Sequence, residues 1–208
     1  MAEIINDPDA FRKLFLDFEH AAFKFEVRRA YGVQSEDLPF QQFLKGHDPG
    51  IEWLRGWLDL MESQTSTGKR VERVRVVDDP PSDYLRFEIS ITPHNLAVGE
   101  DIRYLDRDLA EELNLPHHDF WLFDSRKLAV LHFGDDDMFL GFETIDGVHD
   151  ILPSSNPESM IHPGNLRETF MGVRDSLREV VGIHYSLDDG TGVRGTSGGQ
   201  SKTAAAGT

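Results

Sequence analysis

The stretch from Lys69 to Asp124 contains the side chains best suited to chemistry. Within it the run RVERVRVV has the alternation of a β-strand, which places Arg73 and Arg75 on one face. Two guanidinium groups on one face of a central strand must meet carboxylates or solvent, because unpaired buried charge is very costly. Two interpretations are open: a pocket for an anion or other ligand, or internal pairing with one of three acids, Asp83, Glu88 and Glu100.

We predict that the two arginines belong to a polar binding cluster built by this stretch. Its members are charged or hydrogen-bonding side chains: Arg73, Arg75, Tyr84, Arg86, Glu88, Asn95, Glu100 and Arg103. We predict that replacing Arg75 with alanine abolishes the binding of a ligand or partner and leaves the domain folded. Unfolding on that substitution would instead support internal ion pairs.

Motifs of familiar enzyme classes occur only where their structural context is missing. The chain has no cysteine, and its nine histidines do not have the helix spacing of a zinc hydrolase. Residues 195–199 spell a hydrolase elbow and residues 190–195 a dinucleotide-binding turn, but no predicted helix follows either. We therefore predict no metal site and no cofactor, and we assign no catalytic residue.

The net charge of −16 limits the partners that the protein can have. An acidic surface repels phosphate groups, so we expect no direct binding of nucleic acid, whereas a basic protein partner is compatible with it. The N-terminus lacks the features of a signal peptide, and no apolar run approaches the length of a membrane span. The absence of cysteine suits a reducing compartment, and we expect a cytosolic protein.

The first third of the chain predicts mainly helices. Asp7 and Pro8 suit the start of a helix over residues 7–19. The alternation around Phe25 then predicts a half-buried strand. Helices follow over residues 36–45 and 48–65, the second with an apolar face wide enough for burial on two sides.

Residues 82–92 fit two structures. Their alternation is that of a strand, yet Ser82 is a good helix cap, and we favour a short helix that ends before Pro93. The segments that follow are predicted from apolar patterning and turn residues: a strand at 102–105, a helical turn at 108–113, a strand at 120–123, and a hairpin of 128–133 with 138–145.

The C-terminal part predicts one more helix and a tail. Asn165 can cap a helix over residues 165–182, and from Ser186 onward small residues dominate without an apolar pattern. We therefore predict an α+β fold, with a mixed β-sheet flanked by helices. Residues 1–185 would form a single domain with a C-terminal helix, and residues 186–208 a disordered tail.

Several motifs in combination resemble an uncharacterised actinobacterial domain family, whose genes often lie beside helix-turn-helix regulators. The motifs are RVERVRVV, SDYLRFE, TPHN, GEDIRYL and DFWLFDS, and the resemblance covers most of residues 8–150. It implies an actinobacterial cytosolic protein and no established activity. The order of the elements is also similar to phospholipase-D-like sensor domains of some regulators. The catalytic His-x-Lys motif of that superfamily is missing, so the resemblance implies no hydrolase chemistry.

We therefore expect a non-catalytic regulatory protein that binds a small anionic ligand or a protein partner such as a helix-turn-helix regulator. The alternative is an enzyme of an unrecognised family that acts on a small molecule through the same Arg/Glu/Tyr cluster. A deep pocket that holds Arg75, Glu88 and His94 with a bound ligand or metal would favour the enzyme. A shallow acidic surface would favour a protein partner, and the oligomeric state is open.

Overall fold

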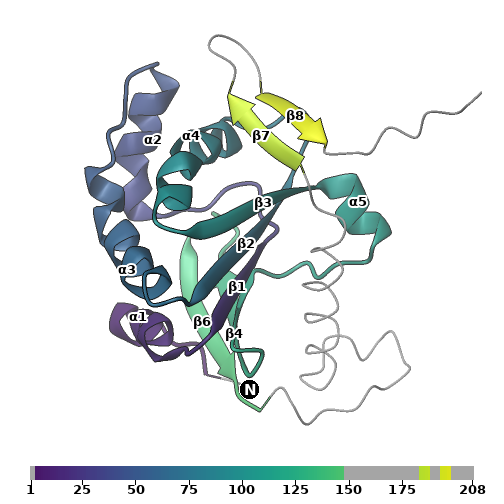
Figure 1. Cartoon of the computed structure of the whole chain (residues 1–208). Helices are drawn as coiled ribbons and strands as arrows, with labels where there is room; N and C mark the ends of the chain where they lie inside the picture. Colours follow the sequence, from purple (N-terminus) through teal and green to yellow (C-terminus); the bar gives the residue numbers. More distant parts are fainter. Residues whose placement is uncertain (1–2, 148–182, 188–192, 198–208) are drawn as a thin grey trace, which may run out of the picture.

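A mixed β-sheet with the strand order β6-β5-β4-β1-β2-β3-β7-β8 forms the centre of the molecule (Figure 1). The structure is a computed structural model, and it describes residues 3–147, 183–187 and 193–197. The strands are β1 (Ala21–Glu26), β2 (Arg70–Val77), β3 (Glu100–Asp106), β4 (Phe120–Phe123), β5 (Lys127–Phe133), β6 (Phe139–Ile145), β7 (Ile183–Leu187) and β8 (Val193–Ser197). The helices are α1 (Pro8–Asp17), η1 (Gln34–Glu36), α2 (Asp37–Leu44), η2 (Glu52–Leu54), α3 (Arg55–Thr65), α4 (Asp83–Ala97) and α5 (Arg107–Glu112). The predicted α+β class is confirmed.

The sheet combines a parallel half with an antiparallel half. Strands β1, β2 and β3 are parallel neighbours, so long connections must join them, and these contain α2 and α3 in one case and α4 in the other. Strands β4, β5 and β6 pair antiparallel through short turns, and β4 joins this half to β1. The strand at 120–123 and the hairpin of two strands predicted in this part of the sequence are confirmed.

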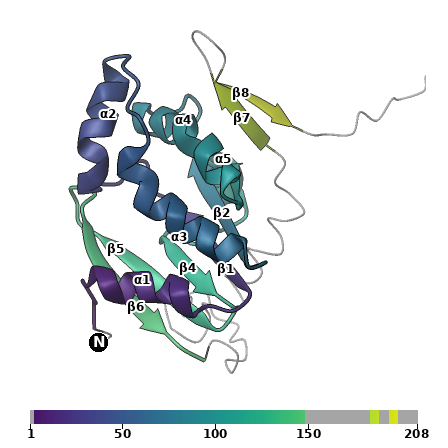
Figure 2. The ribbon, with the colours of Figure 1, turned by 60° about the vertical axis from the view of Figure 1, so that its left-hand side comes forward.

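The two faces of the sheet are covered differently. Helices α1, α3 and α4 lie against one face, which we call the helical face, and α2 packs on the outer side of α4 (Figure 2). The other face carries an apolar cluster that includes Phe23, Phe25 and Val74 and is in contact with α5. The register of the parallel strands sets which side chains meet on the helical face, because Lys24 pairs with Arg73 and Glu26 with Arg75.

The start of the chain matches the prediction, whereas the burial of β1 does not. Asp7 caps α1 by accepting a hydrogen bond from the Asp9 N–H at 2.9 Å, with Pro8 in the first turn. The strand predicted around Phe25 is confirmed, but its predicted half-burial was wrong, because β1 has both faces covered and Glu26 has no exposed surface. The alternation there separates an apolar cluster from a buried polar one. It does not separate a core from solvent.

Helix α4 decides the question left open for residues 82–92. Ser82 caps it and accepts a hydrogen bond from the Leu85 N–H at 3.1 Å. The predicted end before Pro93 was wrong, since the helix continues to Ala97. One side of α4 packs on the sheet through Leu85 and Ile89 and another packs against α2, and this burial outweighs the hydrogen bond that Pro93 cannot donate.

Two other boundaries differ from the sequence prediction. The helix expected from Asp48 starts only with the short turn η2 and continues as α3 from Arg55. Strands β7 and β8 include residues after Ser186, where the sequence predicts a tail without regular structure. The helix predicted over residues 165–182 lies outside the described residues. Within the ranges that the structure describes, no helix combines the length and apolar character needed to cross a bilayer.

Asp124 fastens the end of β4 to the start of β1. Its carboxylate accepts hydrogen bonds from the backbone N–H groups of Glu19 (2.7 Å), His20 (2.7 Å) and Ala21 (2.9 Å). Burial alone would raise the pKa of Asp124, but these donors outweigh it and lower the pKa. Asp124 also has a φ of 52°, in the left-handed region that Asn and Asp tolerate better than alanine.

Replacing Asp124 with alanine is therefore expected to lower the free energy of unfolding by about 2 kcal/mol, through lost hydrogen bonds and backbone strain. Asp124→Asn keeps the backbone preference and part of the hydrogen bonding, so we expect a smaller loss. Urea unfolding of both variants measures this. Equal losses would show that only the charge matters.

Candidate functional site

A network of buried charges lies between the sheet and the helical layer, with Glu26 at its centre. The Glu26 carboxylate accepts hydrogen bonds from Arg75 (Nε–Oε2 2.9 Å, Nη2–Oε1 3.1 Å) and from Arg73 (Nη2–Oε1 3.1 Å). Its Oε1 also forms an ion pair with the ammonium group of Lys24. One carboxylate at the end of β1 therefore holds three cations in place.

Each arginine also pairs with a second carboxylate. Arg75 Nη1 lies 2.5 Å from Glu88 Oε2 of α4, and Arg73 Nη1 lies 3.4 Å from Glu100 Oε2 at the start of β3. Glu100 is fixed in turn by the indole N–H of Trp57 in α3, at 2.7 Å. Both arginines are thus paired inside the protein. Of the three acids that the sequence suggested as partners, Glu88 and Glu100 serve this role, whereas Asp83 pairs with Arg86.

The charges in this network are mutually stabilised. Burial alone would raise the pKa of Glu26, but the positive charges of the two arginines and Lys24 outweigh it and hold the pKa well below its usual range. Burial alone would lower the pKa of Arg73 and of Arg75, but the neighbouring carboxylates raise both. All three groups are therefore ionised at neutral pH.

Glu36, at the end of η1, is in a different situation. Its Oε2 accepts a hydrogen bond from the Tyr84 hydroxyl at 2.6 Å, and no described residue forms an ion pair with it. Burial and then the negative charge of Glu88 raise the pKa of Glu36 to about 7. Burial and the same two carboxylates raise the pKa of Tyr84, which stays protonated. Glu36 thus exchanges a proton near neutral pH.

A cavity of about 770 Å³ opens onto this network. Its charged lining consists of Asp7, Arg12, Lys24, Glu26, Glu36, Arg73, Arg75 and Glu88. Its aromatic lining includes Phe11, Phe15, Trp57, Trp121, Phe133 and Phe139. A volume of this size, an apolar wall and a few converging polar groups are typical of small-molecule sites.

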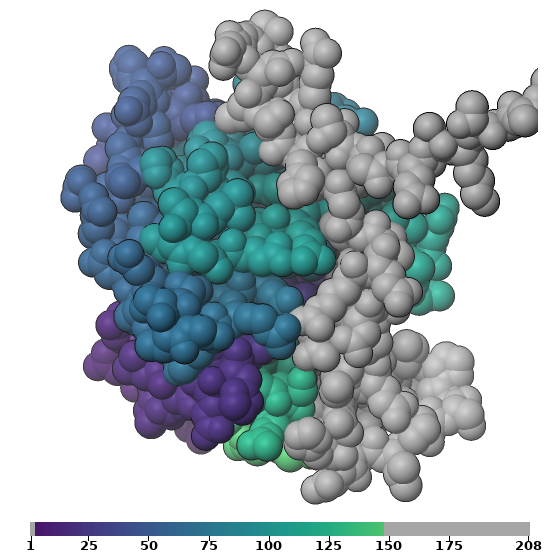
Figure 3. All heavy atoms as spheres, viewed as in Figure 1, coloured from purple at the N-terminus to yellow at the C-terminus, as the bar shows by residue number. Residues whose placement is uncertain are grey.

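The aromatic side chains form a continuous wall from α1 to β5. Phe15 lies edge-on to Trp57 and Trp121, with ring centroids 5.3 Å and 4.8 Å away, and Phe11 is 5.4 Å from Phe15. Helices α1 and α3, which carry Phe11, Phe15 and Trp57, form the purple and blue parts of the outer surface on the left of Figure 3. The Lys24 ammonium lies 5.6 Å from the Trp121 ring centroid and joins the wall to the charges.

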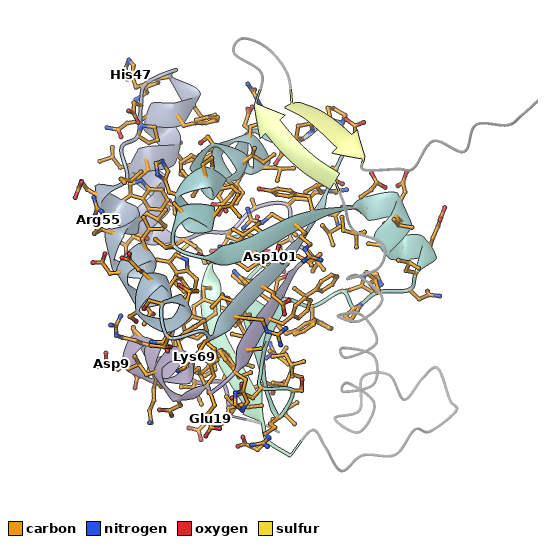
Figure 4. The ribbon with its side chains drawn as sticks, in the orientation of Figure 1. Asp9, Glu19, His47, Arg55, Lys69 and Asp101 are labelled. Atoms are coloured by element: carbon orange, nitrogen blue, oxygen red, sulfur yellow. The ribbon has the colours of Figure 1, made fainter. Side chains whose placement is uncertain are left out.

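The charges at the outer surface of the helical layer are separate from this site. Asp9, His47 and Arg55 lie along its outer edge and are exposed (Figure 4). Exposed charges of this kind contribute little to stability or to a specific site. The buried network is therefore the candidate site.

Five of the eight predicted site residues come together in the network: Arg73, Arg75, Tyr84, Glu88 and Glu100. The other three lie elsewhere. Arg86 is exposed and pairs with Asp83, and Arg103 pairs with Asp101 on the sheet face opposite the cavity. Asn95 is buried in α4 and is not among the residues that line the cavity.

The N-terminal segment contributes residues to the site that its sequence pattern does not indicate. Lys24 and Glu26 alternate with phenylalanines, a pattern typical of a strand with one solvent-facing side. One available signal was that β1 joins two helical segments, because parallel strands between helices are buried on both faces. No local sequence pattern places Glu36 or the aromatic wall in the site, because their proximity to the network depends on tertiary packing.

Comparison with known proteins finds one matching family, and the function of that family is unknown. No protein of curated function matches the chain. The model of a domain of unknown function, DUF6879, matches residues 9–154, and this range includes every charged residue of the network. The chain therefore belongs to the DUF6879 family.

Proposed function

We propose that this protein is a non-catalytic regulatory domain that binds a small molecule in the cavity above the Glu26 network. The observation that carries the proposal is the cavity itself, in which an aromatic wall faces a floor of buried, internally paired charges. Such a floor is held rigid by its own hydrogen bonds, so its side chains lose little conformational freedom when a ligand binds.

The regulatory role rests on the resemblance to a family whose genes often lie beside helix-turn-helix regulators. In this proposal the domain acts in an actinobacterial cytosol, and ligand binding in the cavity controls its interaction with such a regulator. The acidic charge of the chain favours a partner surface that is basic. A pull-down with and without a small-molecule extract, followed by mass spectrometry, tests the partnership. A regulator captured equally in both conditions would contradict control by the ligand.

An enzyme is the second candidate, and one observation favours it. Glu36 has a pKa of about 7, receives a hydrogen bond from Tyr84 and lines the cavity, as a general base would. His94, in contrast, is exposed on α4 and does not line the cavity. In an enzyme, a compound taken into the cavity would leave with a changed mass, and Glu36→Gln would stop the change and still permit binding.

Gly56 offers a direct test of binding in the cavity. This glycine of α3 lines the cavity, and a Cβ added there meets no heavy atom within 4 Å. Gly56→Phe would therefore add a ring at the cavity lining without a clash at its Cβ. Gly56→Ala is the matched control, because it adds only a methyl group.

Native mass spectrometry after incubation with a small-molecule extract of the source organism gives the result. We expect an added mass on the wild type and on Gly56→Ala, and at least a tenfold lower occupancy on Gly56→Phe. A compound retained equally by Gly56→Phe would place binding elsewhere. No retained compound on any form would overturn the proposed function, and a converted compound would favour the enzyme.

A further inference from the structure

We infer that the cavity selects a cation: an amine that is protonated at neutral pH and carries a flat apolar body. This inference rests on the proposed function and names the chemical class of its ligand. In the inferred complex the ammonium group pairs with Glu36, and the apolar body lies against the aromatic wall defined above.

The first support is the balance of charge in the site. Three cations, Lys24, Arg73 and Arg75, face the network, and each is held by a carboxylate. The carboxylates Glu26, Glu88 and Glu100 are sufficient to neutralise them. The cavity lining also holds one exposed charge of each sign at α1, Asp7 and Arg12. An external anion that entered the buried network would have to displace one of its carboxylates and leave it buried and unpaired, which is costly.

The second support is the position of Glu36. It is a further carboxylate on the cavity lining, and within the described residues it has a phenol for a partner and no cation at ion-pair distance. The charged groups that act on it are Glu88 of α4, Arg75 of β2 and Lys24 of β1. The two cations are committed to Glu26 and Glu88, so a ligand cation would supply the charge that Glu36 lacks.

The third support is the composition of the wall. Aromatic faces attract cations through their quadrupole, most strongly when the pair is shielded from water. The protein already uses this attraction in the site, because the Lys24 ammonium lies 5.7 Å from the Tyr31 ring centroid and 5.6 Å from that of Trp121. An amine with an aromatic body therefore meets complementary surfaces at both ends.

Three probes with the same phenyl body and different head groups test the inference. They are 2-phenylethylamine, which is cationic, 2-phenylethanol, which is neutral, and 3-phenylpropionate, which is anionic. Isothermal titration calorimetry measures their affinities at pH 8 and pH 5.5. We expect the amine to bind at least tenfold more tightly than the other two at pH 8. Protonation of Glu36 at pH 5.5 should reduce its affinity at least tenfold.

Two variants of neighbouring residues assign the effect. Glu36→Gln keeps a hydrogen-bond acceptor for Tyr84 and removes the charge, so the preference for the amine and its pH dependence should both be lost. The affinity for 2-phenylethanol should stay within about twofold. Asp37→Asn, at an exposed position beside it, removes the same charge from the surface and should leave the preference for the amine unchanged.

Each remaining outcome has one meaning. Equal binding of the three probes, or tighter binding of the anion, would overturn the inferred cation preference and leave the proposed binding function standing. A preference for the amine that persists in Glu36→Gln would also overturn it, because the charge would act elsewhere. Failure of all three probes, together with no compound retained from the extract, would overturn both.

Discussion

Replacing Arg75 with alanine is expected to lower the free energy of unfolding by about 3–5 kcal/mol. The guanidinium of Arg75 is buried and makes hydrogen bonds to both Glu26 and Glu88. Its removal leaves Glu88 without its cation and Glu26 with one fewer, in surroundings that water reaches poorly. Urea unfolding monitored by tryptophan fluorescence measures the loss.

Arg86→Ala is the matched control for this substitution. Arg86 is exposed and pairs only with the neighbouring surface acid Asp83, so we expect a change below about 0.5 kcal/mol. A stable Arg75→Ala domain that has lost ligand binding would contradict this expectation. It would instead support the sequence-based prediction that Arg75 contacts the ligand directly.

Replacing Glu36 with glutamine is expected to change how stability depends on pH. The folded pKa of Glu36 is about 7, above its ordinary value of 4.5, so the folded state holds a proton that the unfolded state releases between these values. Wild-type stability therefore decreases as pH rises through this window, by about 1.4 kcal/mol per pH unit and about 3 kcal/mol in total. Glu36→Gln does not titrate and escapes this loss.

The measurement is the difference in free energy of unfolding between Glu36→Gln and the wild type. We expect it to shift in favour of the variant by about 3 kcal/mol between pH 4 and pH 8. Asp78 and Asp124 have lowered pKa values, so the folding stability that they contribute is lost in acid. This loss is the same in both proteins and cancels in the difference. Parallel pH profiles for the two proteins would show that Glu36 has an ordinary pKa.

Most of the fold was predictable because its signals are local. The cap and proline that start α1, the apolar run of β4 and the turn between β5 and β6 each depend on a few adjacent residues. The end of α4 was not predictable, because burial of its two sides opposes the local preference set by Pro93. The double burial of β1 was missed because its alternating pattern is also that of a strand on the surface.

The candidate site was predictable only in part, for the same reason. The alternation of Arg73 and Arg75 is local, and it correctly places both side chains on one face. Their shared partner Glu26 lies on another strand, 47 and 49 positions away in the sequence. Only the parallel pairing of β1 with β2 brings it into contact, and no residue pattern within either strand specifies that pairing.

The pairing of β1 with β2 also has a consequence for how the chain selects its correct alignment. A slip of one residue would turn Lys24 and Glu26 toward the apolar cluster on the opposite face and would bring phenylalanines against the two arginines. Every such misalignment buries charges without partners, whereas the native alignment matches them all. The network therefore gives this sheet specificity of strand alignment, a property that a purely apolar interior of the same size would supply less sharply.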